Sequence, residues 1–279
     1  MSAADAARLV SLAAIWGASF LFMRIAAPAL GPVATADLRM LIAGAALVGY
    51  FALTGFEAQW RLRWREYLAI GALNSAAPFL LFAYAALELS VGLLAVLNAT
   101  SPMWAALLGA VALREPLKTG RVAGLLIGMA GVTIVAGPEA STRWLSIAAA
   151  LGAALCYALA GIALKLWGRD APARGLAVGT QLTGGLLLLP VLAIAPPGSV
   201  TLGVAGAVLA LGIVCSALAY ILYFRLIADI GATSALTVTY LIPLFGVLWG
   251  ALALGEALTV ARVLGALVVT AGTVLVLRS

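Results

Sequence analysis

The chain has 279 residues, of which 65% are hydrophobic and only 9% are charged, and its formal net charge is +6. Soluble domains carry about 25% charged residues, so this composition excludes a water-covered globular protein and indicates an integral membrane protein. The absence of histidine and the presence of only two cysteines exclude histidine catalysis, His/Cys metal centres and a disulfide framework. We therefore expect no metal and no cofactor.

Ten apolar runs have the length that a helix needs to cross a bilayer, about 20 residues. In chain order they cover residues 8–28, 33–54, 66–87, 91–113, 120–137, 144–165, 174–194, 201–226, 232–254 and 260–277. The first run is longer than the apolar region of a signal peptide, and another span follows almost at once, so we expect it to be retained. The short connections leave no room for a soluble domain. The sequence predicts an all-α integral membrane fold of ten transmembrane helices.

The stretch from Gly71 to Gly137 returns without a gap 141 positions later, at Gly212 to Arg278. The matched pairs include Ser75/Ser216, Pro102/Pro243 and Glu115/Glu256, and the register extends back to Trp16/Tyr157. This pattern predicts two five-helix repeats, residues 1–140 and 141–279. Because five is odd, the second repeat enters the bilayer from the opposite side, which makes it an inverted repeat. Such a plan places a substrate site between the halves, near the midplane.

The positions of lysine and arginine predict the orientation, because cytoplasmic loops are enriched in both. With the N-terminus inside, twelve of the 16 basic residues lie on the cytoplasmic side. The four outside are Arg24, Arg39, Arg143 and Arg262. We therefore expect both termini in the cytoplasm.

Two groups of motifs are typical of one family. Trp16-Gly17-Ala18-Ser19-Phe20 lies in the first run, and the segment from Pro102 to Glu115-Pro116 is followed by Gly124-x-x-x-Gly128-x-x-Gly131. They resemble EamA-type members of the drug/metabolite transporter superfamily, and the resemblance covers the whole chain as two EamA units. It implies an exporter of amino acids or other metabolites. One branch, the YddG exporters of aromatic amino acids, is similar to this chain in size and layout.

Polar and aromatic side chains near the middle of several runs are candidates for a cavity lining, because polar groups in a span face the bundle interior. Ser75, Phe79 and Phe82 share a helical face through their i, i+4, i+7 spacing. Ser216, Tyr220 and Tyr223 repeat that spacing in the second half. The other candidate substrate-binding residues are Trp16, Asn74, Asn98, Ser101, Tyr157, Thr237 and Tyr240, where Thr237 and Tyr240 continue a spacing that begins at Thr233. For any single Ser or Thr, helix packing is the preferred explanation, and only the repetition favours a site.

Ionisable residues are missing from the middle of every run. Asp37 and Arg39 fall in the first two turns of the run 33–54, where we interpret them as an interfacial pair with Arg39 reaching outward. The predicted site is therefore neutral, which disfavours phosphate-bearing substrates and proton coupling through a central carboxylate. A neutral or zwitterionic, partly apolar substrate fits best.

Two prolines and one glycine motif suggest moving and packing parts. Pro102 and Pro243 are expected inside helices, where proline removes a backbone hydrogen bond and permits a bend. We interpret them as gating bends, with static kinks as the alternative. The Gly124-x-x-x-Gly128 motif predicts a packing face within the bundle, with a dimer contact as the alternative. A monomer is favoured.

Together these features predict an exporter of the bacterial inner membrane that works by alternating access. Amino acids, aromatic or other neutral ones, are the favoured substrates, and no nucleic-acid partner is expected. A multidrug or general-solute carrier of the same fold is the alternative. A membrane-embedded enzyme would need a nucleophile–base pair or a metal-binding carboxylate cluster, which this sequence does not supply. A closed structural membrane protein is the remaining alternative.

Overall fold

The computed structural model describes residues 2–54, 59–112, 114, 118–137, 141–167, 171–195 and 197–278. All regular structure within these residues is helical. The elements are α1 (Ala3–Leu30), α2 (Pro32–Ala52), α3 (Trp60–Gly71), η1 (Ala72–Ala76), α4 (Ala77–Ala85), α5 (Val91–Asn98), α6 (Ser101–Ala112), α7 (Thr119–Ala136), α8 (Trp144–Trp167), α9 (Ala173–Ile194), α10 (Leu202–Leu209), η3 (Ala210–Leu218), α11 (Ala219–Ile230), α12 (Ala232–Ala235), η4 (Leu236–Tyr240), α13 (Ile242–Leu254) and α14 (Val260–Arg278).

The ten predicted runs all coincide with helical segments. Within the described residues, nine helices are long and apolar enough to cross a membrane, and the tenth run contains the shorter apolar helix Ile242–Leu254. The first helix begins five residues before its predicted start. Ser2 Oγ accepts a hydrogen bond from the Asp5 backbone, and the Asp5 carboxylate accepts one from the Ser2 backbone; this reciprocal cap satisfies two free N–H groups of the first turn. The all-helical membrane fold is confirmed.

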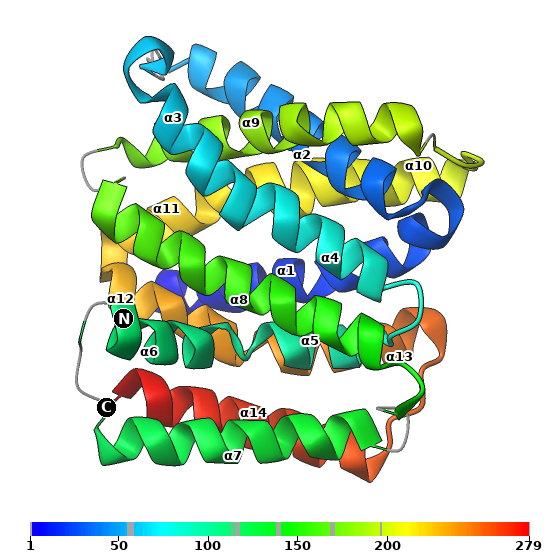
Figure 1. Cartoon of the computed structure of the whole chain (residues 1–279), viewed down its shortest axis with the longest axis vertical. Coiled ribbons are helices and arrows are strands. Elements are labelled where there is room, and N and C mark those ends of the chain that lie inside the picture. Colours follow the sequence, from blue (N-terminus) through cyan, green and yellow to red (C-terminus); the bar gives the residue numbers. More distant parts are fainter. Residues whose placement is uncertain are drawn as a thin grey trace.

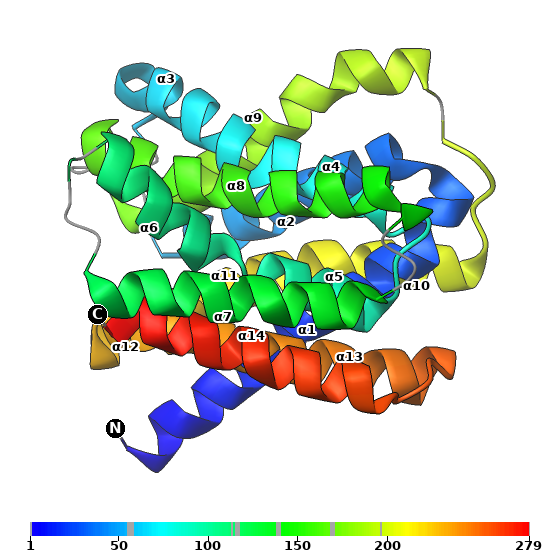
Figure 2. The same cartoon turned by 60° about the horizontal axis from the view of Figure 1, so that its bottom comes forward.

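The helices lie side by side in one bundle, and both chain termini lie at the same end of it (Figure 1). Figure 2 shows the same arrangement from a second direction, with the first turns of α1 projecting beyond their neighbours. At one edge, α7 and α14 run alongside each other in both views. We refer below to the end that holds the termini as the terminal end.

Glycines bring α7 and α14 into close contact. A Cβ at Gly272 would lie 2.6 Å from the Gly128 backbone nitrogen, and one at Gly124 would lie 2.7 Å from the Gly272 carbonyl oxygen. Backbones approach this closely only where both helices carry small residues. The predicted packing face therefore lies within the bundle, as expected. Glu115 and Pro116, which belong to the same motif region, lie outside the described residues.

The two halves of the chain also pack through contacts that recur at the same 141-residue offset. Leu182 of α9 packs on Gly44 of α2, and Leu41 of α2 packs on Gly185 of α9. Both members of each contact are offset counterparts, since 41 and 182, like 44 and 185, differ by 141. The pair α2 and α9 therefore forms a contact that is equivalent when its two partners are exchanged.

Two π-helical segments interrupt the long helices at corresponding places. The segment Ala72–Ala76 contains Ser75, and the segment Ala210–Leu218 contains its counterpart Ser216. A π-helical turn is wider than an α-helical one, leaves some backbone groups with altered partners, and occurs often at functional sites. Both serines are buried.

Pro102 and Pro243 lie at the starts of helices, and not in helix interiors as the sequence predicts. The chain leaves helical geometry at Ala99–Thr100 and passes through the 3₁₀ segment Leu236–Tyr240. Each proline is the second residue of the helix that follows, α6 or α13. Proline is tolerated there because the first N–H groups of a helix have no intrahelical partner. Two half-helices therefore meet at each of these positions.

The half-helices pack together at one end of the bundle. Val247 of α13 approaches Gly92 of α5, and Ala95 of α5 approaches Gly246 of α13. The other half-helices are α6 in the first half and α12 with η4 in the second. They make no comparable packing contact with each other within the described residues. The bundle is therefore closed between α5 and α13, at the end opposite the termini (Figure 1).

Candidate functional site

Arg39 of α2 occupies the middle of the bundle. Its side chain is 5% exposed, its Nε donates a 2.9 Å hydrogen bond to Ser216 Oγ, and its guanidinium carbon lies 3.8 Å from the centre of the Phe79 ring. Ser216 is equally far, fourteen residues, from the two ends of the span Leu202–Ile230. The interpretation of Arg39 as an interfacial residue that reaches outward is therefore wrong.

Asp37, two residues earlier in α2, does not pair with Arg39. Its side chain is fully buried, and neither carboxylate oxygen has a hydrogen-bond partner within the described residues. Residues two apart on a helix point to nearly opposite sides because each residue advances by about 100°. The predicted interfacial pair is thus absent. Arg39 points toward Ser216, and Asp37 does not.

A polar network joins the central helices of both halves. Asn74 Nδ2 donates to the Tyr220 hydroxyl at 3.3 Å, and Gln181 Nε2 donates to Ser75 Oγ at 3.1 Å. These bonds connect η1 with α11 and α9 with η1. The sequence predicts that the helical faces of Ser75 and Ser216 line one cavity. Contacts of Arg39 and Gln181 and the Asn74–Tyr220 hydrogen bond bring these two faces together.

Gln181 is a site residue that our sequence reasoning missed. Its side chain is fully buried, and its Oε1 has no partner within the described residues. A carboxamide in the middle of the apolar run 174–194 was the available signal, because large polar groups rarely occupy a span without a partner. Its contact with Ser75 mirrors that of Arg39 with Ser216, although the two donors are not exact counterparts in the 141-residue register.

Aromatic side chains surround this network in two corresponding contacts. The ring centres of Trp16 and Tyr223 are 5.3 Å apart, and those of Phe82 and Tyr157 are 6.2 Å apart. Trp16 corresponds to Tyr157 and Phe82 to Tyr223 in the repeat register. These four of the predicted aromatic residues thus form two pairs that are equivalent in the repeat register.

The structure does not bring the remaining predicted residues into this network. The Ser101 hydroxyl donates to the Asn98 backbone carbonyl at 2.6 Å, a bond within its own chain segment. The Asn98 side chain has no hydrogen bond within the described residues. Tyr240 is half-buried, and its carbonyl accepts from Thr270 at 3.3 Å. Because residues 236–240 form a 3₁₀ helix, the α-helical spacing assumed for Thr237 and Tyr240 is wrong. The side chain of Thr233 lies outside the described part of the chain.

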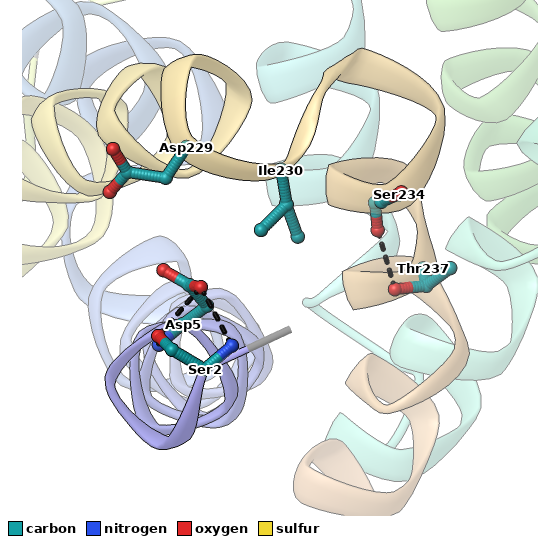
Figure 3. Close-up of a pocket in the computed structure, with 6 residues that line it drawn as sticks. All are labelled: Ser2, Asp5, Asp229, Ile230, Ser234 and Thr237. Atoms are coloured by element: carbon teal, nitrogen blue, oxygen red, sulfur yellow. Dashed lines mark hydrogen bonds between the residues drawn. The ribbon is translucent and has the colours of Figure 1, made fainter.

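Thr237 instead lines an open pocket at the terminal end. Figure 3 shows Ser2 and Asp5 at the start of α1, Asp229 and Ile230 at the end of α11, and Ser234 beside Thr237. The pocket has a volume of about 510 Å³, and the Thr237 hydroxyl donates to the Ser234 carbonyl at 2.6 Å. Arg8 forms ion pairs with Asp5 and Asp229 next to it. The pocket lies at the end of the bundle where the half-helices are not packed together.

Among the described residues, the groups available at the centre are therefore hydroxyl, amide and aromatic side chains and the Arg39 cation. Buried hydroxyl and amide groups can exchange their present partners for those of a bound molecule, and aromatic faces offer apolar walls. The expectation of a wholly neutral site is wrong because of Arg39. Within the described residues, no group of three or more Cys, Asp or Glu side chains gathers that could hold a metal ion.

Comparisons with known proteins give one family for the whole chain. A model of the EamA-like transporter family matches residues 7–137 and 144–278. Protein PecM of Dickeya dadantii is 30% identical over 267 residues, covering 94% of this chain and 88% of the relative. The uncharacterized transporter YvbV of Bacillus subtilis is 25% identical over 274 residues, with coverage of 96% and 90%. A solved crystal structure superposes with a TM-score of 0.69 at 18% identity, covering 99% of this chain and 96% of its own, which shows a shared fold.

Proposed function

The chain belongs to the EamA-like transporter family, and from that premise we propose that it exports amino acids, aromatic or other neutral ones, by alternating access. Family membership establishes the coarser function, a multi-pass membrane transporter with a small-molecule substrate. The proposal adds the substrate class, the mechanism and the direction of transport. It places the protein in a bacterial inner membrane, as a monomer.

One observation carries the proposal. Polar and aromatic side chains from both halves meet in the middle of the bundle, where Asn74 of the first half donates to Tyr220 of the second. A site built across two halves changes its access when the halves rock against each other, which is how repeat-based transporters work. The aromatic pairs Trp16–Tyr223 and Phe82–Tyr157 suit a substrate with an apolar or aromatic portion.

Equivalent packing of the halves supports an inverted repeat with units 1–140 and 141–279. The α2–α9 contact is unchanged when its halves are exchanged, and α7–α14 is built in the same way. The position of the basic residues supports cytoplasmic termini. With that orientation, the packed α5–α13 end faces outward and the terminal end faces the cytoplasm, so the described conformation is inward-facing.

The breaks at Pro102 and Pro243 support a gating role for the half-helices. A helix that is already interrupted has fewer backbone hydrogen bonds to lose when its two parts reorient. In the proposed cycle, α5 and α13 separate, while α6 approaches α12 and η4. The substrate bound between them then faces the opposite side.

Efflux from proteoliposomes tests the proposal. Purified protein is reconstituted in liposomes loaded with labelled phenylalanine, tyrosine, tryptophan or leucine, and protein-free liposomes provide the control. We expect protein-dependent efflux, with faster exchange when unlabelled amino acid is supplied outside, because exchange avoids the reorientation of the empty carrier. The absence of efflux for every amino acid would refute the substrate class.

The same liposomes distinguish the multidrug or general-solute alternative. Cationic dyes are the probe for that activity, and we expect no protein-dependent movement of them. A guanidinium in the centre of the bundle repels a second cation. Dye transport without amino-acid transport would favour the alternative.

A further inference from the structure

We propose that the Arg39 guanidinium binds the carboxylate of the transported substrate, so that the substrates are carboxylates with an apolar or aromatic side chain. This inference rests on the proposed function and specifies which part of the substrate the central site recognises. The sequence alone suggested a neutral site, and the geometry of Arg39 is what points to an anionic substrate group.

The first argument is that Arg39 is a buried cation without a counter-ion. It is 5% exposed, and within the described residues its contacts are Ser216 Oγ, the Met23 sulfur and the Phe79 ring. None of these groups carries a negative charge. A charge held inside a membrane bundle is costly unless it is paired, and arginines in such places mark substrate pathways.

The second argument concerns the unused donors of the guanidinium. Arginine has five N–H groups, and Nε donates to Ser216 while Nη1 lies 3.9 Å from the Met23 sulfur, a weak acceptor. Nη2 bonds to no atom of the described chain. The two terminal nitrogens form the edge that binds a carboxylate through two parallel hydrogen bonds. A substrate carboxylate would replace one weak sulfur contact with two charge-assisted bonds.

The third argument excludes a protein carboxylate as the partner. Asp37 is on the same helix but points elsewhere, and no ion pair joins it to Arg39. Within the described residues, the groups that interact electrostatically with Arg39 include Tyr157, Cys215 and Tyr220, whose hydroxyls and thiol are ordinarily neutral at pH 7. The missing negative charge therefore has to come from a bound molecule.

The surroundings also select the kind of anion. A phosphate dianion needs more than one cation, whereas no second lysine or arginine is among the electrostatic neighbours of Arg39 in the described part of the chain. A carboxylate carries a single charge and matches the planar guanidinium. The guanidinium lies over the Phe79 ring, a contact that favours arginine over lysine.

Arg39 also touches both halves of the chain. Phe79 belongs to the first half and Ser216 to the second, so the guanidinium lies at the boundary about which the halves would rock. A carboxylate bound there would stay bound while access changes from one side to the other. This is the place that the proposed mechanism requires for a substrate anchor.

Thermal unfolding of the purified protein in detergent tests the inference independently of transport. Ligands that bind the folded state raise the unfolding temperature, and the probes are phenylacetate and 3-phenylpropionate against phenylacetamide and 3-phenylpropionamide. We expect the wild-type chain to bind the two acids about tenfold or more tightly than the amides, as the loss of a charge-assisted pair implies. Equal binding of acids and amides, or no stabilisation by either acid, would overturn the inference.

Variants then assign the preference to Arg39. Arg39→Gln should lose the preference for acids while still binding amides. Arg39→Lys should retain a reduced preference, because it keeps the positive charge but loses the two parallel N–H donors of the guanidinium. Arg65→Gln is the matched control, since Arg65 also lies over an aromatic ring, Trp64, but on the exposed start of α3. If Arg39→Gln keeps the full acid preference, Arg39 is not the anchor.

The two proposals fail in different ways. If the wild-type chain prefers acids but no amino acid moves across proteoliposomes, the carboxylate site stands and the amino-acid substrate is wrong. If amino acids move but their amides move equally well, the exporter stands and the role of Arg39 is wrong. Even if both Arg39 variants fail to fold, the unfolding curves of the wild-type chain show whether it prefers acids to amides.

Discussion

The Glu256 carboxylate accepts a 2.8 Å hydrogen bond from the Val91 backbone N–H. Val91 is the first residue of α5, so its N–H has no partner within its own helix. The bond therefore ties the loop after α13 to the start of α5. Close by in the chain, Arg24 of α1 donates to the carbonyls of Ala86 and Leu87, at 2.9 and 2.8 Å. These contacts join α1 and the loop after α13 to the segment that leads into α5, at the end opposite the termini.

Removal of the Glu256 carboxylate should open that end. A hydrogen bond to a charged group contributes about 1.5–3 kcal/mol, so Glu256→Ala should shift the closed-to-open equilibrium by about tenfold or more. The measurement is maleimide labelling of Leu94→Cys, a fully buried position of α5, in a background without Cys156 and Cys215. We expect faster labelling in Glu256→Ala and a smaller effect in Glu256→Gln, which keeps an acceptor oxygen. Unchanged labelling in both would show that this bond does not hold the end closed.

A side chain at Gly272 should destabilise the fold. A Cβ there would meet the Gly128 backbone nitrogen at 2.6 Å and the Gly124 carbonyl oxygen at 2.7 Å, and backbone atoms cannot rotate away. Overpacking of this kind costs about 1–3 kcal/mol or more, so Gly272→Val should lower the unfolding temperature in detergent. Gly206→Val is the control, because a Cβ at that glycine meets nothing within 4 Å. Equal unfolding temperatures for the two variants would contradict the α7–α14 packing.

Loss of the Tyr220 hydroxyl should weaken transport more than stability. Tyr220→Phe keeps the ring but removes the acceptor of the 3.3 Å bond from Asn74. One hydrogen bond contributes about 0.5–1.5 kcal/mol to stability, so the unfolding temperature should fall only slightly. We expect efflux to fall by about three- to tenfold, because the hydroxyl belongs to the proposed substrate site. Tyr84→Phe serves as the control because Tyr84 is an exposed residue of α4. If Tyr220→Phe transports at the normal rate, the hydroxyl has no part in the site.

Replacement of Asp37 by asparagine should stabilise the protein at neutral pH. Both carboxylate oxygens are buried without partners in the described residues, and an unpaired charge in such a place is costly. Asn has nearly the same shape and no charge, so Asp37→Asn should increase the stability by about 1–3 kcal/mol, measured as a higher unfolding temperature. Asp37→Val tests the shape, because Val178 occupies the equivalent position of the second half. A large loss of stability in Asp37→Asn would indicate that the carboxylate has a partner that maintains the fold.

The candidate site could be predicted in part. Ser75, Phe79, Ser216 and Tyr220 were found from their repeated spacing, and each now has a contact in the central network. The spacing failed at Thr237 because residues 236–240 form a 3₁₀ helix, in which the side-chain period is three residues per turn. No sequence pattern predicts this change from α-helical to 3₁₀ geometry, because it depends on how the chain connects to α13 just before Pro243.

The helical spans and the 141-residue register were determined by the sequence alone. Bilayer thickness sets the length of an apolar run, and a repeated pattern is visible without any coordinates. The direction of Arg39 was decided by tertiary structure, because a long flexible side chain near a helix end can reach either outward or inward. Packing of α2 against η3 placed Ser216 within its reach. The same packing buried Asp37, only two residues away, without a hydrogen-bond partner among the residues that the structure describes.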